Sequence, residues 1–208
     1  MQLTSSSWAD GARIPARHAA GKPDAATTVS FSDNVSPALA WSGVPPGTRS
    51  LALICHDPDV PSRGDDVNQP GREVPASLPR VDFFHWVLVD LPPTLAGFAE
   101  GEWSRGFTPR GKPGPAAAHG ARQGLNDYTG WFAGHAEMGG NYFGYDGPFP
   151  PFNDAIVHRY VFTLYALDVE RLAVEGPFTG TEARAAMRGH VLAEASFSGT
   201  YTLNARLA

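Results

Sequence analysis

The stretch GPFPPFNDAIVHRYVFTLYALD, which runs from Gly147 to Asp168, joins a stiff loop to a segment that is typical of a core strand. The prolines of GPFPP have fixed φ angles, which restricts the loop. The run RYVFTLYAL, from Arg159 to Leu167, is rich in aromatic and β-branched residues, which favour strands. His158 stands where the loop meets the predicted strand. A titratable side chain in that position, behind a rigid loop, predicts one wall of a binding pocket.

Two other runs have the same apolar character. SLALIC spans Ser50 to Cys55, and FFHWVLVDL spans Phe83 to Leu91, where Pro92 and Pro93 end it. Continuous apolar runs of this length between turn signals predict strands buried on both faces. The 23 glycines and 19 prolines fall between such runs, as in all-β proteins with long loops. We therefore predict an all-β fold in a single domain over residues 1–208, since all-β domains often reach about 250 residues as one unit.

One helix is expected near the C-terminus. The segment TEARAAMRGHVLAEA begins at Thr181, a residue type that caps helix N-termini, and Glu182 follows it in the first turn. Ala186, Val191 and Leu192 are expected to face inward. In the following ASFSGTYTLN, alternate residues are apolar, which predicts a half-buried strand; the inward set is Phe197, Tyr201 and Leu203.

The segment from about Ala99 to Asp146 is rich in glycine and shows little periodicity. A long loop in a compact domain is usually functional or mobile. We expect the part from Gly111 to Gly140 to be the most variable in conformation and to border the pocket.

The composition narrows the functional classes. Hydrophobic residues make up 42% and charged residues 18%, which is enough for a packed core. The formal net charge of -5 argues against a nucleic-acid partner. Cys55 is the only cysteine, so no intramolecular disulfide can form and a buried small side chain is expected. We find no signal-peptide pattern and no apolar run long enough for a membrane helix, so a cytoplasmic protein with no integral membrane segment is expected.

Polar, titratable residues stand at one end of each predicted core strand. HDPDVP follows the first strand, DFFHW opens the second, and VHRY opens the third. If the three strands are neighbours, these side chains converge on one pocket; the candidates are Asp57, His85, His158 and Tyr160. Protonated imidazoles and a phenol hydroxyl would supply donors and positive charge to an anion. Asp57 would accept from a histidine N–H and favour its charged form, leaving the other ring nitrogen for the anion.

Other polar residues are given structural roles. Asp59 is interpreted as a turn former, and Arg159 is expected to reach a carboxylate at the strand end and not the ligand. The remaining histidines are expected to face solvent or to cap other groups; they are His18, His56, His119, His135 and His190.

The sequence resembles the phosphatidylethanolamine-binding protein family, and is most similar to its bacterial Raf-kinase-inhibitor-like branch. The matching motifs are DPDVP, HWVLVDLP, GPFPP and HRYVFTLYALD, and weaker matches extend from about residue 2 to residue 201. The resemblance implies a β-sandwich of two antiparallel sheets with a pocket for phosphate or a phosphorylated head group. It implies a pocket lined by Asp57, His85, His158, Tyr160 and the loop prolines Pro148, Pro150 and Pro151. It further implies a non-catalytic binding protein, a kinase or protease partner, and a homodimer.

The sequence departs from the family pattern around the pocket. Phe149 stands where bacterial members commonly have cysteine, and FNDAIV, between the prolines and His158, is longer than usual and has no glycine. The loops near residues 62–82 and 99–146 are enlarged. We therefore expect the rim of the pocket, and the size of its ligand, to differ from those of relatives.

Two alternatives stay open at this point. One is a hydrolase-type enzyme that acts on a phosphoryl or acyl group, with His85 and His158 as acid and base. The other is an interaction protein with a vestigial pocket. No cofactor or metal is predicted, because dinucleotide and P-loop motifs, cysteine pairs, HExxH and EF-hand spacing are absent. A serine nucleophile of the hydrolase type is not predicted either, because no G-x-S-x-G elbow is present.

Overall fold

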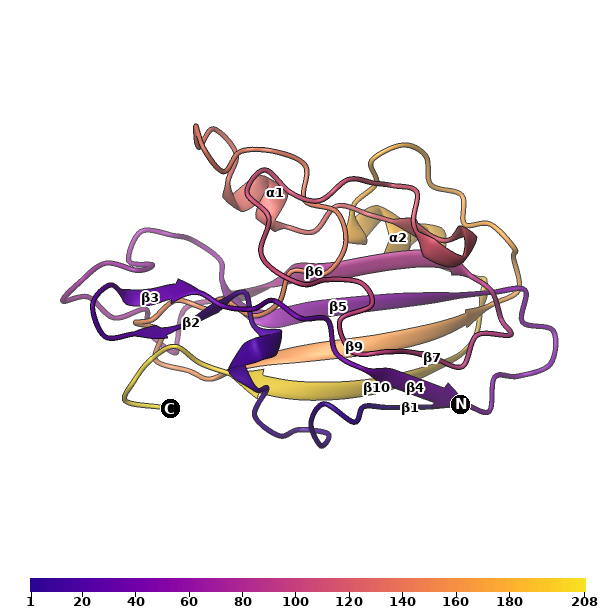
Figure 1. Cartoon of the computed structure of the whole chain (residues 1–208), viewed down its shortest axis with the longest axis horizontal. Helices are drawn as coiled ribbons and strands as arrows, with labels where there is room; N and C mark the ends of the chain where they lie inside the picture. The colour runs from indigo at the N-terminus through magenta and orange to yellow at the C-terminus, as the bar shows by residue number, and fades with distance from the viewer.

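The three apolar runs lie side by side in one five-stranded antiparallel sheet (Figure 1). The computed structural model describes all residues from 1 to 208. The strand order is β10-β9-β5-β6-β8, with β5 at Ser50–Pro61, β6 at Arg80–Leu91, β8 at Arg122–Gln123, β9 at His158–Leu167 and β10 at Val191–Tyr201. Because β5 pairs with β6 on one side and β9 on the other, the polar ends of all three strands meet.

Two smaller antiparallel sheets complete the fold. The three-stranded sheet has the order β1-β4-β7, with β1 at Gln2–Thr4, β4 at Leu39–Ser42 and β7 at Gly97–Phe98. The strands β2 (Gly21–Asp24) and β3 (Thr28–Phe31) pair with each other at one end of the molecule (Figure 1). The short helices are η1 (Ala16–His18), η2 (Ala118–Gly120), α1 (Tyr128–Trp131) and α2 (Gly180–Ala186). The predicted all-β fold with antiparallel sheets is confirmed.

Both faces of the large sheet are covered, which explains the continuous apolar runs. Along β5, Leu51, Leu53 and Cys55 point to the core shared with the three-stranded sheet. Ala52 and Ile54 point the other way, to a second core closed by α2 and the loop before it. Side chains alternate between faces along a strand, so only a run that is apolar at every position satisfies both cores. The expected burial of Cys55 is confirmed.

A β-bulge interrupts the pairing of β5 with β6 next to the polar end. Cys55 is paired with Trp86, whereas the next residue, His56, is paired with Phe84. His85 is therefore the extra residue of β6. A bulge bends the strand and re-aims the side chain of the extra residue. This local irregularity turns His85 toward the pocket described below.

The predicted C-terminal helix exists but is shorter than expected. The N-cap is Thr179 and not Thr181: its hydroxyl accepts from the Glu182 amide, and the Glu182 carboxylate accepts from the Thr179 amide in return. The expectation that Val191 and Leu192 face inward from this helix is wrong, because both are exposed and begin β10. The turn at Gly189, where φ is +82°, ends the helical segment before them. The predicted inward set of Phe197, Tyr201 and Leu203 is confirmed.

Two of the histidines that were expected to face solvent or to cap other groups do not fit that expectation. The His56 side chain is 15% exposed, and its Nδ1 is buried without a hydrogen-bond partner. His18 is buried, with Nδ1 2.8 Å from the Val35 carbonyl oxygen and its ring against Trp8. A solvent-facing role for this residue is therefore wrong.

No helix in the structure has the length and apolar composition that would let it span a bilayer.

Candidate functional site

A cavity of about 420 Å³ opens where β5 ends and where β6 and β9 begin. Six of the seven predicted site residues line it: Asp57, His85, Pro150, Pro151, His158 and Tyr160. Pro148 is the exception. It is buried behind the wall, and its carbonyl oxygen accepts from the amides of Ala20 and Gly21. Pro148 thus ties the proline loop to β2.

His158 lies between two carboxylates. Its Nδ1 is 2.7 Å from Asp57 Oδ2, and its Nε2 is 3.1 Å from Asp154 Oδ2. Burial opposes a charge on this ring, but the hydrogen bonds to Asp154 and Asp57 outweigh it and raise the pKa of His158 to about 9. Both ring nitrogens therefore carry hydrogen at neutral pH and donate to protein carboxylates. The expectation that one nitrogen of His158 is free for a ligand is wrong, because Asp154 occupies it.

The charges around His158 cancel. Arg80 donates two hydrogen bonds to Asp154, at 2.6 Å and 3.0 Å. Two carboxylates thus face one imidazolium and one guanidinium, so this cluster offers no net positive charge to an anion. Its effect on the pocket is to hold Asp57 and His158 in one geometry, since a paired and hydrogen-bonded buried charge is costly to disturb.

His85 differs from His158 in that its pKa is lowered and not raised. Its Nδ1 lies 2.7 Å from the backbone carbonyl oxygen of Asp146, which can only accept, so Nδ1 carries the hydrogen. Burial, the strongest influence, lowers the pKa of His85 to about 4, although Asp57 and the Asp146 carbonyl act in the other direction. The ring is therefore neutral at neutral pH. The expectation of two protonated imidazoles in the pocket is wrong for His85.

Tyr160 presents the pocket with a donor. Its hydroxyl is buried and makes no hydrogen bond of normal geometry within the protein, although the Asp57 carboxylate lies near enough to interact with it. Burial and the nearby Asp57 raise the pKa of Tyr160 well above its usual value, so the hydroxyl keeps its hydrogen. Buried polar groups in proteins are almost always paired. An unpaired hydroxyl in the wall of a cavity is therefore the strongest local indication of a bound group.

Asp146 is a functional residue that the sequence interpretation missed. It is buried, and its carboxylate accepts from Asn34 and Asn126 and pairs with Lys112. Its backbone amide and carbonyl bond to His85. Asp146 therefore has two roles: its backbone positions His85, and it is the residue directly before the proline loop. The available signal was an acidic residue directly before the Gly-Pro of GPFPP.

The departures from the family pattern supply much of the wall. Asp154, in FNDAIV, provides the second carboxylate for His158. In the same segment, the Asn153 side chain accepts from the Asn68 amide and donates to three carbonyls of the enlarged loop after β5. This loop carries Arg63, Val67 and Asn68 in the cavity wall.

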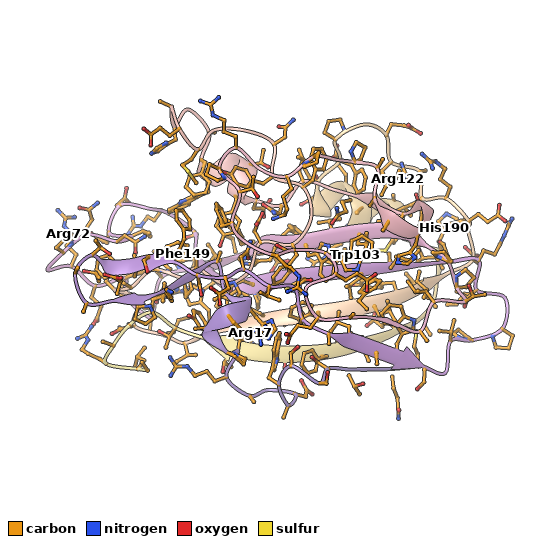
Figure 2. All side chains as sticks on the ribbon, in the orientation of Figure 1. Arg17, Arg72, Trp103, Arg122, Phe149 and His190 are labelled. Atoms are coloured by element: carbon orange, nitrogen blue, oxygen red, sulfur yellow. The ribbon has the colours of Figure 1, made fainter.

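Aromatic side chains surround the mouth of the cavity. Phe31 and Trp131 are about half exposed, at 49% and 53%. Figure 2 shows Phe149 beside β2 and β3, at the opposite end of the large sheet from His190. A Cβ atom on Gly21 would lie 2.4 Å from the Phe149 ring, so the ring needs a glycine there. The aromatic wall is formed by Phe31, Phe83, Tyr128, Trp131, Phe132 and Phe149. As expected, part of the segment 111–140 borders the pocket.

Two flanking residues stay outside the cavity lining. Asp59 accepts from the Arg159 amide and from two guanidinium nitrogens, at 2.8–2.9 Å. The prediction that Arg159 reaches a carboxylate is confirmed. Asp59 is that carboxylate, so it does more than form a turn.

Nowhere in the structure do three or more His, Cys, Asp or Glu side chains gather in a way that could hold a metal ion.

The fold and the cavity define a β-sandwich protein with a pocket at one end of its central strands. The family model of the phosphatidylethanolamine-binding proteins matches residues 4–202. The chain belongs to this family.

Relatives cover nearly the whole chain. A UPF0098 protein of Methanothermobacter thermautotrophicus is 34% identical over 97% of this chain and 98% of its own length. The UPF0098 protein YbhB of Escherichia coli is 30% identical over 97% of this chain and 100% of its own length. These names state no activity.

Solved structures share the fold. CT736 of Chlamydia trachomatis, described as a homolog of phosphatidylethanolamine-binding protein, superposes with a TM-score of 0.63 at 31% identity, covering 96% of this chain and 95% of its own. Escherichia coli YbcL superposes with a TM-score of 0.67 over 97% of each chain. At 24% identity, YbcL speaks for the fold alone.

Proposed function

We propose that this chain is a non-catalytic binding protein whose pocket takes a phosphate, free or on a larger molecule such as a head group. The observation that carries the proposal is the Tyr160 hydroxyl, a buried donor without a partner in the cavity wall. A phosphate oxygen is the acceptor that would satisfy it. The cavity of about 420 Å³ is larger than a phosphate, so an organic group has room beside the aromatic side chains.

The rim of the cavity, where Arg63 lies, supports an anionic ligand more than the floor does. The floor is formed by Asp57, His85, His158 and Tyr160. The floor cluster around His158 is neutral, whereas Arg63 in the cavity wall is an exposed cation whose Nε lies 3.6 Å from Asp65. An exposed ion pair of this kind is weak, so the Arg63 guanidinium is available to a second acceptor. Phosphate would thus be held by the Tyr160 hydroxyl, by His85 and by Arg63.

The geometry disfavours the hydrolase alternative. His158 would have to act as acid or base, but both of its nitrogens are bonded to carboxylates. A turnover screen of the purified chain with p-nitrophenyl phosphate and p-nitrophenyl acetate is expected to show no rate above background. Enzyme turnover that His85→Ala abolishes would replace the binding proposal with the catalytic one.

The proposal predicts a defined loss for Tyr160→Phe. Removal of the hydroxyl should weaken binding of phenyl phosphate by about 1.5–3 kcal/mol, the usual value for a hydrogen bond to a charged group. Titration calorimetry of the full chain measures this loss. Tyr165→Phe is the matched control, because Tyr165 is a half-buried tyrosine of the same strand that lies outside the cavity. Absence of saturable binding to the unmodified protein would overturn the proposal, and would favour a vestigial pocket.

A homodimer and a kinase or protease partner belong to this proposal on the strength of family membership alone, and a cytoplasmic location is proposed with them. Sedimentation of the purified chain tests the homodimer directly.

A further inference from the structure

The hydrogen on His85 is fixed by its neighbours. The Asp146 carbonyl oxygen lies 2.7 Å from Nδ1, so Nδ1 is the donor. Nε2 has no hydrogen-bond partner in the protein, and the ring lines the cavity while only 3% exposed. In the neutral ring, Nε2 is therefore a bare acceptor that faces the ligand space.

The groups that face His85 do not favour a second hydrogen on it. The Tyr160 and Tyr128 rings stand at 5.1 Å and 5.6 Å from the His85 ring, and neither tyrosine is charged. Asp57 favours a positive ring, whereas charged His158 and the nearby His56 oppose it, and burial opposes it most. The Asp146 carboxylate is already neutralised by Lys112. The titratable and charged groups around the ring are Asp57 and His56 on β5, His158 and Tyr160 on β9, Tyr128 on α1, Asp146 just before the proline loop, and Lys112 in the segment between β7 and η2.

The floor thus offers a ligand one donor and two acceptors. The donor is the Tyr160 hydroxyl, and the acceptors are Nε2 of His85 and the Asp57 carboxylate. A fully ionised oxyanion would place an oxygen lone pair against the lone pair of Nε2. A buried acceptor left without a donor is costly. A ligand that carries its own acidic hydrogen satisfies both sides.

Resting on the proposed phosphate-binding function, we propose that the pocket selects tetrahedral oxyanions that bring an acidic hydrogen, namely phosphomonoesters and inorganic phosphate, over sulfate esters of the same shape. The P–OH group donates to Nε2 of His85, and an ionised phosphate oxygen accepts from the Tyr160 hydroxyl. A sulfate ester has no such hydrogen, so its binding requires His85 to take up a proton from solvent. The low pKa of His85 makes this uptake unfavourable at neutral pH.

Phenyl phosphate and phenyl sulfate test the proposal as a matched pair. At about pH 5.5, below the second pKa of about 6 typical of phosphomonoesters, both carry close to one negative charge, and only phenyl phosphate has an acidic hydrogen. Titration calorimetry of the full chain should give about a 5- to 150-fold weaker affinity for phenyl sulfate, since that ligand brings no hydrogen to the buried Nε2 acceptor. Repeating the titration in two buffers of different ionisation enthalpy should show close to one proton taken up per phenyl sulfate bound, and only about a quarter of a proton per phenyl phosphate, which is the share present as the dianion at about pH 5.5.

Two further arms isolate His85. As the pH falls toward about 4, where circular dichroism must show a folded protein, the affinity for phenyl sulfate should rise and the gap should narrow. In His85→Gln, the side-chain amide can donate at the same place, so the gap should close and proton uptake with phenyl sulfate should disappear. If His85→Gln does not fold, the pH series and the proton count on the unmodified chain still decide.

The outcomes separate this inference from the proposed function. Equal affinities for both probes at about pH 5.5, without proton uptake, overturn the selectivity and leave phosphate binding in place. Tighter binding of phenyl sulfate than of phenyl phosphate likewise overturns the selectivity. Failure of both probes to bind removes the proposed function, and the selectivity falls with it.

Discussion

At the scale of single residues, the two pocket histidines differ because of their partners. His158 bonds to carboxylates at both nitrogens, whereas His85 bonds to a carbonyl at one nitrogen and faces the cavity with the other. A carboxylate stabilises imidazolium, and burial against aromatic rings stabilises neutral imidazole. The same residue type is therefore charged at one wall of the pocket and neutral at the next.

The charge on His158 predicts how stability changes with pH. Its folded pKa of about 9 lies above the unfolded value of about 6.5. The pairing therefore contributes its full stability below about pH 6.5 and loses it as the pH rises through about 9. Urea unfolding of the unmodified protein should show a falling free energy over this range.

The matching variant for this prediction is His158→Gln, in which the alkaline loss of stability should largely vanish. His190→Gln is the control, because His190 is half exposed and pairs with Asp168 at the far end of the sheet. An alkaline slope that survives in His158→Gln would assign the effect to another group.

At the scale of elements, the N-terminus of α2 is defined by its capping box. Thr179 and Glu182 exchange hydrogen bonds there, and Thr181 lies inside the helix with an exposed side chain. Thr179→Ala should lower the free energy of unfolding by about 1 kcal/mol, the usual cost of losing an N-cap. Thr181→Ala should change it by less than about 0.5 kcal/mol, as surface substitutions do. Chemical denaturation measures both, and an equal cost for the two variants would show that the capping box is not what stabilises this helix.

At the scale of the whole molecule, the long segment before the proline loop divides into packed and exposed parts. Ala121, Arg122, Asn126 and Tyr128 are buried, and β8 and α1 lie among them. Residues 133–140 are mostly exposed. Because backbone groups exchange hydrogen through local opening, residues 121–131 should exchange slowly and residues 133–140 fast. Hydrogen exchange followed by mass spectrometry resolves the two parts, and uniformly slow exchange across 111–140 would contradict an exposed, mobile rim.

Local pattern was enough to predict the central strands and much of the pocket. A run that is apolar at every position must be covered on both faces, which predicted β5, β6 and β9 as buried strands. The sequence pattern left their adjacency as a condition, and the pairing of β5 with β6 and β9 brought Asp57, His85, His158 and Tyr160 together. The C-terminal helix was misplaced because Thr179 and Thr181 are both good N-caps. The spacing of the capping box selects the first of them, because Glu182 stands three residues after Thr179, whereas Arg184 stands three residues after Thr181.

The sequence alone therefore determined the buried strands and the polar residues at their ends, because both can be read from the hydrophobic pattern. The fold decided the rest of the pocket lining, including the aromatic wall and Arg63. The tertiary structure alone decided the protonation of His85 and His158 and which of their ring nitrogens has no hydrogen-bond partner. Asp154 takes the second nitrogen of His158, and the Asp146 carbonyl fixes the hydrogen of His85, 61 residues away in the chain. Neither contact leaves a periodic signal, because each joins single polar atoms of loops and strands. The charge of a histidine is set within a few ångströms by burial and by the partners that the fold brings to it.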